Sequence, residues 1–266
     1  MSMIRKPAVS DLFYPEDADS LQQMVTGYLD SAMQDGQSPK ALIAPHAGYI
    51  YSGPIAASAY AGLSTAANRI SRVVLIGPSH RVPFYGLATS GADYFRTPLG
   101  DIPIDRQTIQ TLEALPQVTC LEAAHTQEHS LEVQLPFLQV VLREFSLVPL
   151  VVGDASGDQV AEVLARAWGG EETLIVISSD LSHYHDYVTA QRMDKATSDA
   201  IVTLHPERLD YEDACGRIPV QGLLLEAKRL GLYGKLVDLR NSGDTAGSKD
   251  RVVGYGAYIF TRSEAA

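Results

Sequence analysis

Histidine or aspartate follows three apolar segments of this chain. His46, His80 and Asp180 stand just past runs such as 73–76, in which Val, Leu and Ile follow one another. Short apolar runs closed by Gly, Pro or Ser are typical of buried strands in a parallel sheet. Because parallel strands place their carboxyl ends at one edge, where open α/β sheets bind ligands, we expect these side chains to converge there.

The two histidines are the first candidate metal ligands. Pro45 fixes the backbone angle φ just before His46, and Gly48 permits a close backbone approach just after it. His80 repeats the pattern after Pro78. Imidazole is the commonest protein ligand for zinc, iron and copper, so the pair indicates a metal site more strongly than either histidine alone.

Cys215 is the third candidate ligand. Its neighbours Asp213, Gly216 and Arg217 are not aliphatic, and it precedes a predicted helix, where a thiolate would be favoured. A thiolate with two imidazoles leaves a fourth coordination position open, as in catalytic metal sites. The alternative is that Cys215 packs as a small buried hydrophobe. We interpret Cys120 as structural.

Asp180 and His183 are candidate acid–base residues. Asp180 could ligate a metal, orient a histidine or cap a helix. His183, three residues later, would face the same side if a helical turn begins here, and a histidine beside a metal is a natural general base. His185 is expected to point elsewhere.

Two further residues are candidates for substrate binding. His129 could line the pocket as a donor, whereas the preceding Glu128 fits the positive end of a helix. Tyr49 could offer its phenol at the rim of the pocket or pack in the core. His125 and His205 are expected on the surface.

The alternation of strands and helices predicts an α/β fold with a mainly parallel central sheet flanked by helices. We expect one domain, 1–266. Helical periodicity or composition predicts helices at 17–33, 55–63, 105–115, 128–138, 156–168, 188–204 and 219–230. Further strands are expected at 84–89, 94–97, 147–152, 236–241 and 252–260, and a loop at 48–54.

Composition narrows the function classes. The chain has 266 residues, 45% of them hydrophobic, and a net charge of −11, which would repel nucleic acid. Two cysteines are too few for a disulfide framework, which favours a reducing compartment. The N-terminus lacks a signal-peptide core and no apolar run approaches the about 18 residues of a membrane span, so we expect a cytoplasmic protein. Phosphate-loop, dinucleotide-binding and nucleophile-elbow motifs are absent from the sequence.

Five segments together resemble the MEMO family, whose prokaryotic members are called AmmeMemoRadiSam system protein B. These segments are 45–49, 77–80, 128–137, 178–184 and 215–216, and the resemblance extends from about Arg5 to Phe260. It implies a fold similar to the class III extradiol ring-cleaving dioxygenases, such as the LigB-type subunit. Those enzymes hold a non-haem Fe(II) with two histidines and a carboxylate.

In the MEMO pattern the corresponding ligands would be His46, His80 and Cys215. The thiolate replaces the carboxylate, which argues against ring cleavage and favours a softer metal or a different redox role. The resemblance implies Fe(II), with Zn or Cu as alternatives, and Asp180 with His183 as the supporting acid–base pair.

Three functions follow as hypotheses. The first is a metal-binding redox protein related to the extradiol dioxygenases. The second is a non-catalytic interaction module, because the prokaryotic family name reflects association with a radical SAM protein and an AMMECR1-type protein. The third is a zinc hydrolase with Asp180 as its base.

Overall fold

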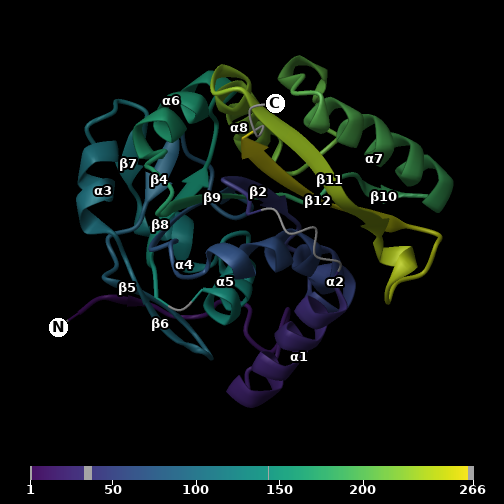
Figure 1. Ribbon diagram of the computed structural model, residues 1–266, viewed down its shortest axis with the longest axis horizontal. Coiled ribbons are helices and arrows are strands. Elements are labelled where there is room, and N and C mark those ends of the chain that lie inside the picture. Colours follow the sequence, from purple (N-terminus) through teal and green to yellow (C-terminus); the bar gives the residue numbers. More distant parts are fainter. Residues whose placement is uncertain (1, 33–37, 143, 263–266) are drawn as a thin grey trace.

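A mixed β-sheet forms the centre of the computed structural model, which describes residues 2–32, 38–142 and 144–262 (Figure 1). In spatial order its strands are β10 (His183–His185), β12 (Val252–Arg262), β2 (Ala41–Ala44), β9 (Thr173–Ser178), β3 (Arg72–Pro78), β8 (Ser146–Val152), β4 (Leu87–Thr89) and β7 (Val118–Cys120), and β11 (Leu232–Asn241) also pairs with β12. A separate small sheet contains β1 (Ile4–Arg5), β5 (Tyr94–Thr97) and β6 (Gly100–Pro103).

The four central strands are parallel, but the sheet as a whole is not. β2, β9, β3 and β8 run side by side in one direction, and nearly all of their residues are buried. β12 joins β2 antiparallel on one side, and β4 joins β8 antiparallel on the other. The prediction of a mainly parallel sheet is therefore wrong at the edges, where the alternation of elements gave no information on strand direction.

Helices cover both faces of this sheet (Figure 1). One face carries α3 (Arg106–Leu112), α6 (Gly157–Ala167), α7 (Tyr187–Val202) and α8 (Arg217–Arg229). The other carries α1 (Ala18–Ser31), α2 (Tyr49–Tyr60) and α5 (Leu135–Val141), while the short α4 (Glu122–Thr126) lies against β4. Short 3₁₀ turns cover Ala61–Ala66, Glu132–Gln134, Pro206–Arg208 and Ser242–Asp244. Among the helices of the described residues, none combines the length and apolarity needed to cross a membrane.

Helix α2 corrects the predicted loop at 48–54. The helix begins at Tyr49, directly after Gly48, and contains Pro54. Gly53 serves close packing and not a turn, because a Cβ there would lie 2.5 Å from the ring of Tyr28 on α1. The predicted helix 55–63 thus begins six residues earlier and ends at Tyr60, where a 3₁₀ turn takes over.

The segment that begins with Glu128 also differs from its prediction. Residues 128 and 129 are irregular, 130 and 131 form a turn, Glu132–Gln134 is a 3₁₀ turn, and the α-helix begins only at Leu135. Glu128 therefore does not lie at a helix start. Met33, at the predicted end of the first helix, lies outside the described residues.

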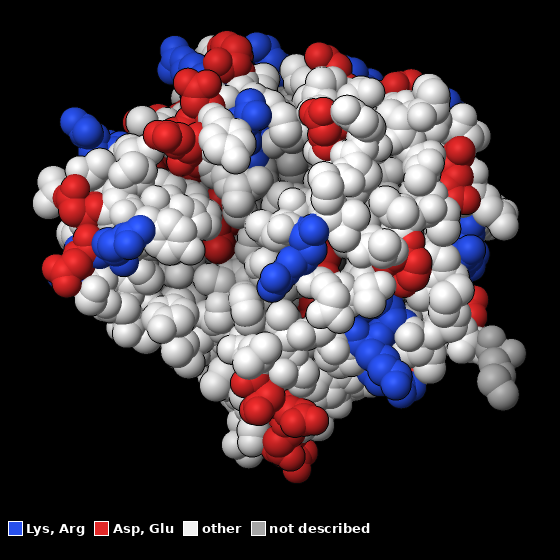
Figure 2. Space-filling model, turned by 180° about the vertical axis from the view of Figure 1, so that it is seen from behind, with Lys and Arg blue, Asp and Glu red and all other residues white. Residues whose placement is uncertain are grey.

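The charged side chains on the surface reflect the acidic composition of the chain. Figure 2 shows acidic and basic side chains interspersed over one face, with a group of acidic side chains at its lower end. The chain carries 32 Asp and Glu against 21 Lys and Arg, so local gatherings of basic residues are the exception.

Candidate metal centre

His46 lies just beyond β2, and its proton can be assigned from its neighbours. The imidazole is buried, and its Nδ1 lies 2.9 Å from Ser178 Oγ. That hydroxyl donates its only hydrogen to the Ser130 carbonyl, so it must accept the hydrogen of His46 Nδ1. Nε2 of His46 is therefore left with its lone pair, as a metal ligand requires.

His80 lies just beyond β3 and has the same arrangement with a different partner. Its Nδ1 donates to Glu128 Oε1 at 2.8 Å, and its backbone N–H donates to Glu128 Oε2 at 2.6 Å. These bonds lower the pKa of Glu128 to about 2, against the effect of its burial, so the carboxylate is ionised and can only accept. A carboxylate on Nδ1 fixes the imidazole and makes Nε2 a stronger ligand.

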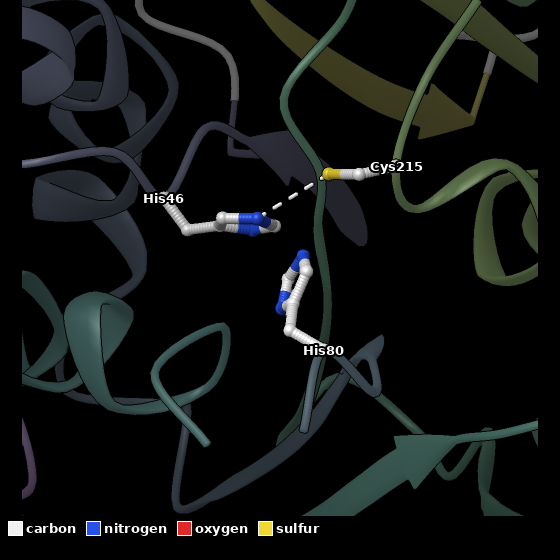
Figure 3. A group of neighbouring side chains, drawn as sticks. All are labelled: His46, His80 and Cys215. Carbon is white, nitrogen blue, oxygen red and sulfur yellow. Dashed lines mark hydrogen bonds between the residues drawn. The ribbon is translucent and has the colours of Figure 1, made fainter. Parts of the chain in front are cut away.

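Cys215 reaches the two histidines from a loop before α8. Its sulfur lies 3.3 Å from His46 Nε2, and Figure 3 shows His80 directed toward the same point. One ligand atom from each of the three residues lies within 4.8 Å of the others. The predicted ligands are thus brought together.

Gly216 brings Cys215 to this position. Its N–H donates to Ser179 Oγ at 2.9 Å, and a Cβ there would lie 2.6 Å from the Ser179 Cβ. The loop can therefore approach the end of β9 only because residue 216 has no side chain. Burial, with the nearby Asp180 carboxylate, raises the pKa of the Cys215 thiol, so a cation is needed for the thiolate to form at neutral pH.

Asp180 lies beneath the cluster. It is 4% exposed and accepts the His46 N–H at 2.7 Å. Its own N–H donates to the Cys215 sulfur at 3.3 Å, so it contacts two candidate ligands. Burial raises the pKa of Asp180 to about 6, although the His46 N–H stabilises the carboxylate.

His183 is partly exposed at the edge of the sheet. It lies in β10 and pairs with Val253, so the helical turn expected here is a strand instead. It follows Asp180 by three residues, and no hydrogen bond joins the two side chains among the described residues.

His129 adds a third imidazole to the cluster. Its ring stacks on His80 with 4.5 Å between centroids, and its other neighbours are His46 at 5.4 Å and Phe13 at 5.0 Å. Its buried Nδ1 has no hydrogen-bond partner among the described residues; Glu128 Oε1 lies 3.4 Å away. Burial and the neighbouring His80 lower the pKa of His129 to about 4. His129, His80 and Glu128 form a second group with metal-ligand spacing.

The structure places other candidates away from the site. Tyr49 is buried in the core, where its hydroxyl donates to the Val133 carbonyl, so it packs and does not line the rim. The expectation that His125 lies on the surface is wrong, because it is 1% exposed and its Nε2 contacts the Ala88 carbonyl. His205 is partly exposed beside Glu207, and Cys120 is exposed.

Sequence reasoning missed the residues that hold the ligands. Gln134 is fully buried and donates to the Pro45 carbonyl and to Ser178 Oγ, which fixes the acceptor of His46. The sequence indicated only that Ser178 ends a strand and not that it accepts a hydrogen bond from His46. Glu128 precedes His129 in the sequence, but nothing there indicates that it binds His80, which lies 48 residues earlier.

A cavity of about 420 Å³ opens beside the cluster. Its lining residues are Pro78, Ser79, Val82, Pro83, Phe84, Tyr85, Val152, Gly153, Asp154, Cys215, Ile218 and Pro219. Most of these side chains are apolar, and Cys215 connects the cavity to the histidines. A small organic molecule in this cavity would therefore contact Cys215.

The donor set fits a metal ion. Burial, and then its histidine neighbours, hold the pKa of His46 well below its usual range, so that imidazole is neutral at neutral pH. Nε2 of His80 makes no hydrogen bond among the described residues. Two imidazoles and a sulfur suit zinc, iron or copper and not the oxygen-seeking magnesium or calcium.

Comparison with known proteins gives full-length matches. The family model described as Memo-like protein matches residues 5–259. A MEMO1 family protein of Aquifex aeolicus is 37% identical over 97% of this chain and 99% of its own. A MEMO1 family protein of Nitrosopumilus maritimus is 32% identical over 97% of this chain and 100% of its own.

A solved structure matches the fold. The uncharacterized protein JW3007 from Escherichia coli K12 superposes with a TM-score of 0.57 at 16% identity, covering 82% of this chain and 98% of that chain. At this identity the likeness shows a shared fold alone.

Proposed function

The chain belongs to the Memo family, and from the geometry of its site we propose that it is a metal-binding redox protein that holds non-haem Fe(II) through His46, His80 and Cys215. The observation that carries this proposal is the assignment of both imidazole protons to Nδ1, by Ser178 and by Glu128. Nε2 of His46 then lies 3.3 Å from the Cys215 sulfur, and Nε2 of His80 makes no hydrogen bond among the described residues. A cluster of histidines with a purely structural role would not require the Nδ1 of both rings to be held by a hydrogen-bond acceptor.

The cavity beside the ligands supports a small, largely apolar substrate. Phe84, Ile218 and Pro219 supply apolar walls, and Asp154 supplies a carboxylate. Its volume of about 420 Å³ lies within the ordinary range for small-molecule sites. We therefore infer that the substrate is a small organic molecule that enters beside Cys215.

Each supporting residue has a distinct task in this proposal. A bound Fe(II) would supply electron transfer together with open positions for O₂ and substrate. Asp180 holds the His46 backbone, because its Oδ1 accepts that N–H, and so acts as a positioning residue. His129, which is neutral, stacks on His80 with 4.5 Å between ring centroids and so helps to hold that imidazole in place. His183, which is partly exposed, is the candidate general base.

Metal analysis of protein purified without oxygen tests the proposal. The wild type is expected to carry about one iron per chain, and the double variant His46→Ala, Cys215→Ser to carry almost none. The matched control is the double variant His205→Ala, Cys120→Ser, which changes the same residue types outside the site and should retain the wild-type metal content.

Two results would contradict the proposal. Full metal occupancy in the His46→Ala, Cys215→Ser protein would remove these residues as ligands and favour an interaction module instead. Zinc as the bound metal, in protein with no redox activity, would retain the ligands but replace the redox function with hydrolysis.

A further inference from the structure

A second cavity, of about 820 Å³, lies at the end of the central sheet opposite the candidate metal centre. It is lined by Lys40, which precedes β2, and by Thr173, which begins β9. The metal centre lies beyond the opposite ends of these two strands. The lining residues are Ser38, Pro39, Lys40, Thr65, Ala66, Arg69, Ile70, Gly170, Glu171, Thr173, Tyr233, Lys235, Thr261 and Arg262.

The charge of this cavity is opposite to that of the chain. Its lining includes the basic residues Lys40, Arg69, Lys235 and Arg262 against the single acidic residue Glu171. The whole chain has a net charge of −11, with 32 Asp and Glu against 21 Lys and Arg, so a cavity lined mainly by basic residues departs from the average composition. A concave site with one sign of charge concentrates ligands of the opposite sign.

Lys40 sets a fixed positive charge in the wall. Its ammonium donates to the carbonyls of Trp168 at 2.7 Å, Gly170 at 2.6 Å and Thr173 at 2.6 Å. All three N–H groups are thus used by neutral acceptors, so Lys40 contributes charge and no hydrogen bond to a ligand. Burial lowers the pKa of Lys40 to about 8, and the nearby Arg262 adds to this effect.

The acidic side chains near the cavity do not cancel its positive charge, because Glu172 is bonded to its own neighbours and Glu171 faces four basic residues. Glu172, next to the lining, directs its carboxylate at the Gly170 N–H and the Thr173 hydroxyl, and it pairs with Arg72. Arg69 and Arg262 form no ion pair among the described residues. Their guanidinium groups can bind phosphate oxygens in a bidentate manner.

We propose that this cavity binds a small phosphorylated molecule, with the phosphate held by Arg69 and Arg262 and a planar group lying on Tyr233. Tyr233 is 62% exposed although it lines the cavity, so its ring is available to a ligand. The volume lies within the range of sites for small ligands. This proposal is independent of the metal centre.

Calorimetric titration of the full chain tests the proposal with three probes: pyrophosphate, ADP and adenosine. We expect saturable binding of pyrophosphate and ADP and none of adenosine. The double variant Arg69→Gln, Arg262→Gln should weaken the binding of pyrophosphate and of ADP by about tenfold or more, because each change removes a charged hydrogen-bonding group. Arg166→Gln, at an exposed arginine of α6 outside the cavity, is the matched control and should bind as the wild type does.

The same titrations can overturn the proposal. Absence of binding at millimolar pyrophosphate and ADP, or unchanged affinity in the double variant, removes the phosphate site. Adenosine binding as tight as that of ADP removes the phosphate as the recognised group. Tyr233→Ala should weaken the binding of ADP and leave the binding of pyrophosphate unchanged. Equal ADP affinity in Tyr233→Ala and the wild type would exclude the contact with the Tyr233 ring. Since both arginines are exposed, the variants should retain the unfolding temperature of the wild type.

Discussion

At the scale of single residues, two different acceptors hold the same ring nitrogen, Nδ1, of the two histidines. His46 donates from Nδ1 to the neutral hydroxyl of Ser178, whereas His80 donates to the ionised carboxylate of Glu128. A charged acceptor forms the stronger hydrogen bond and increases the electron density on the imidazole. Glu128 therefore matters for metal affinity as well as for geometry.

Replacement Glu128→Gln is expected to weaken metal binding by about 10- to 100-fold, because the amide lacks the charge that orients His80 and strengthens it as a ligand. Competition with a chromophoric chelator measures the affinity. Glu207→Gln removes the carboxylate from a comparable pair with His205, 2.6 Å from its Nδ1 and away from the site, and should leave the affinity unchanged. Equal metal affinity in the two variants would show that Glu128 has no such role.

The sequence indicated the candidate ligands but not the residues that hold them. His46 and His80 stand out because each closes an apolar run and lies just after a proline, and Cys215 stands out because Asp213, Gly216 and Arg217 surround it before a predicted helix. Ser178, Gln134 and Glu128 act through contacts with segments 44 to 132 residues away, which no local pattern records. Their roles became visible only when the strands were assembled.

At the scale of elements, the loop before α8 completes the site because Gly216 fits against the end of β9. A Cβ at this position would lie 2.6 Å from the Ser179 Cβ and 2.8 Å from the Ser178 carbonyl oxygen. Since Ser178 also accepts the hydrogen of His46 Nδ1, displacement here affects two candidate ligands together.

Replacement Gly216→Ala is expected to lower the free energy of unfolding by about 1–3 kcal/mol, as overpacking does, and to weaken metal binding because Cys215 moves away. Urea unfolding and chelator competition measure the two effects. Gly27→Ala is the matched control: the residue lies in α1 with nothing within 4 Å of the added Cβ, so stability should rise slightly. Normal stability and metal affinity in Gly216→Ala would contradict the close packing.

The elements that sequence reasoning placed correctly are those with continuous apolar runs. β3, β8 and β9 are buried along nearly their whole length, so their composition alone indicated central strands. The antiparallel edges were not predicted, because strand direction depends on connections and not on composition. Gly53 and Pro54 resembled a loop, although the glycine serves the packing of α1 on α2.

At the scale of the whole molecule, buried polar groups connect the N-terminal segment to the body of the protein. Glu132 is fully buried, pairs with Arg5, and accepts the N–H groups of Ala8 at 2.7 Å and Val9 at 3.0 Å. Arg5 also donates to the backbone carbonyl of His125, which lies in the same buried region. The protonation of this region therefore affects global stability.

His125 gives this molecule a predictable sensitivity to acid. Burial lowers its pKa from 6.5 to about 4, so between these values the unfolded chain binds more protons than the folded one. The free energy of unfolding should therefore fall as the pH drops through this window, by about 3 kcal/mol from His125 alone. His125→Gln, which can still donate to the Ala88 carbonyl, should reduce this slope in urea unfolding measured from pH 7 to 4. An identical slope in His125→Gln and the wild type would mean that His125 does not resist protonation in the folded state.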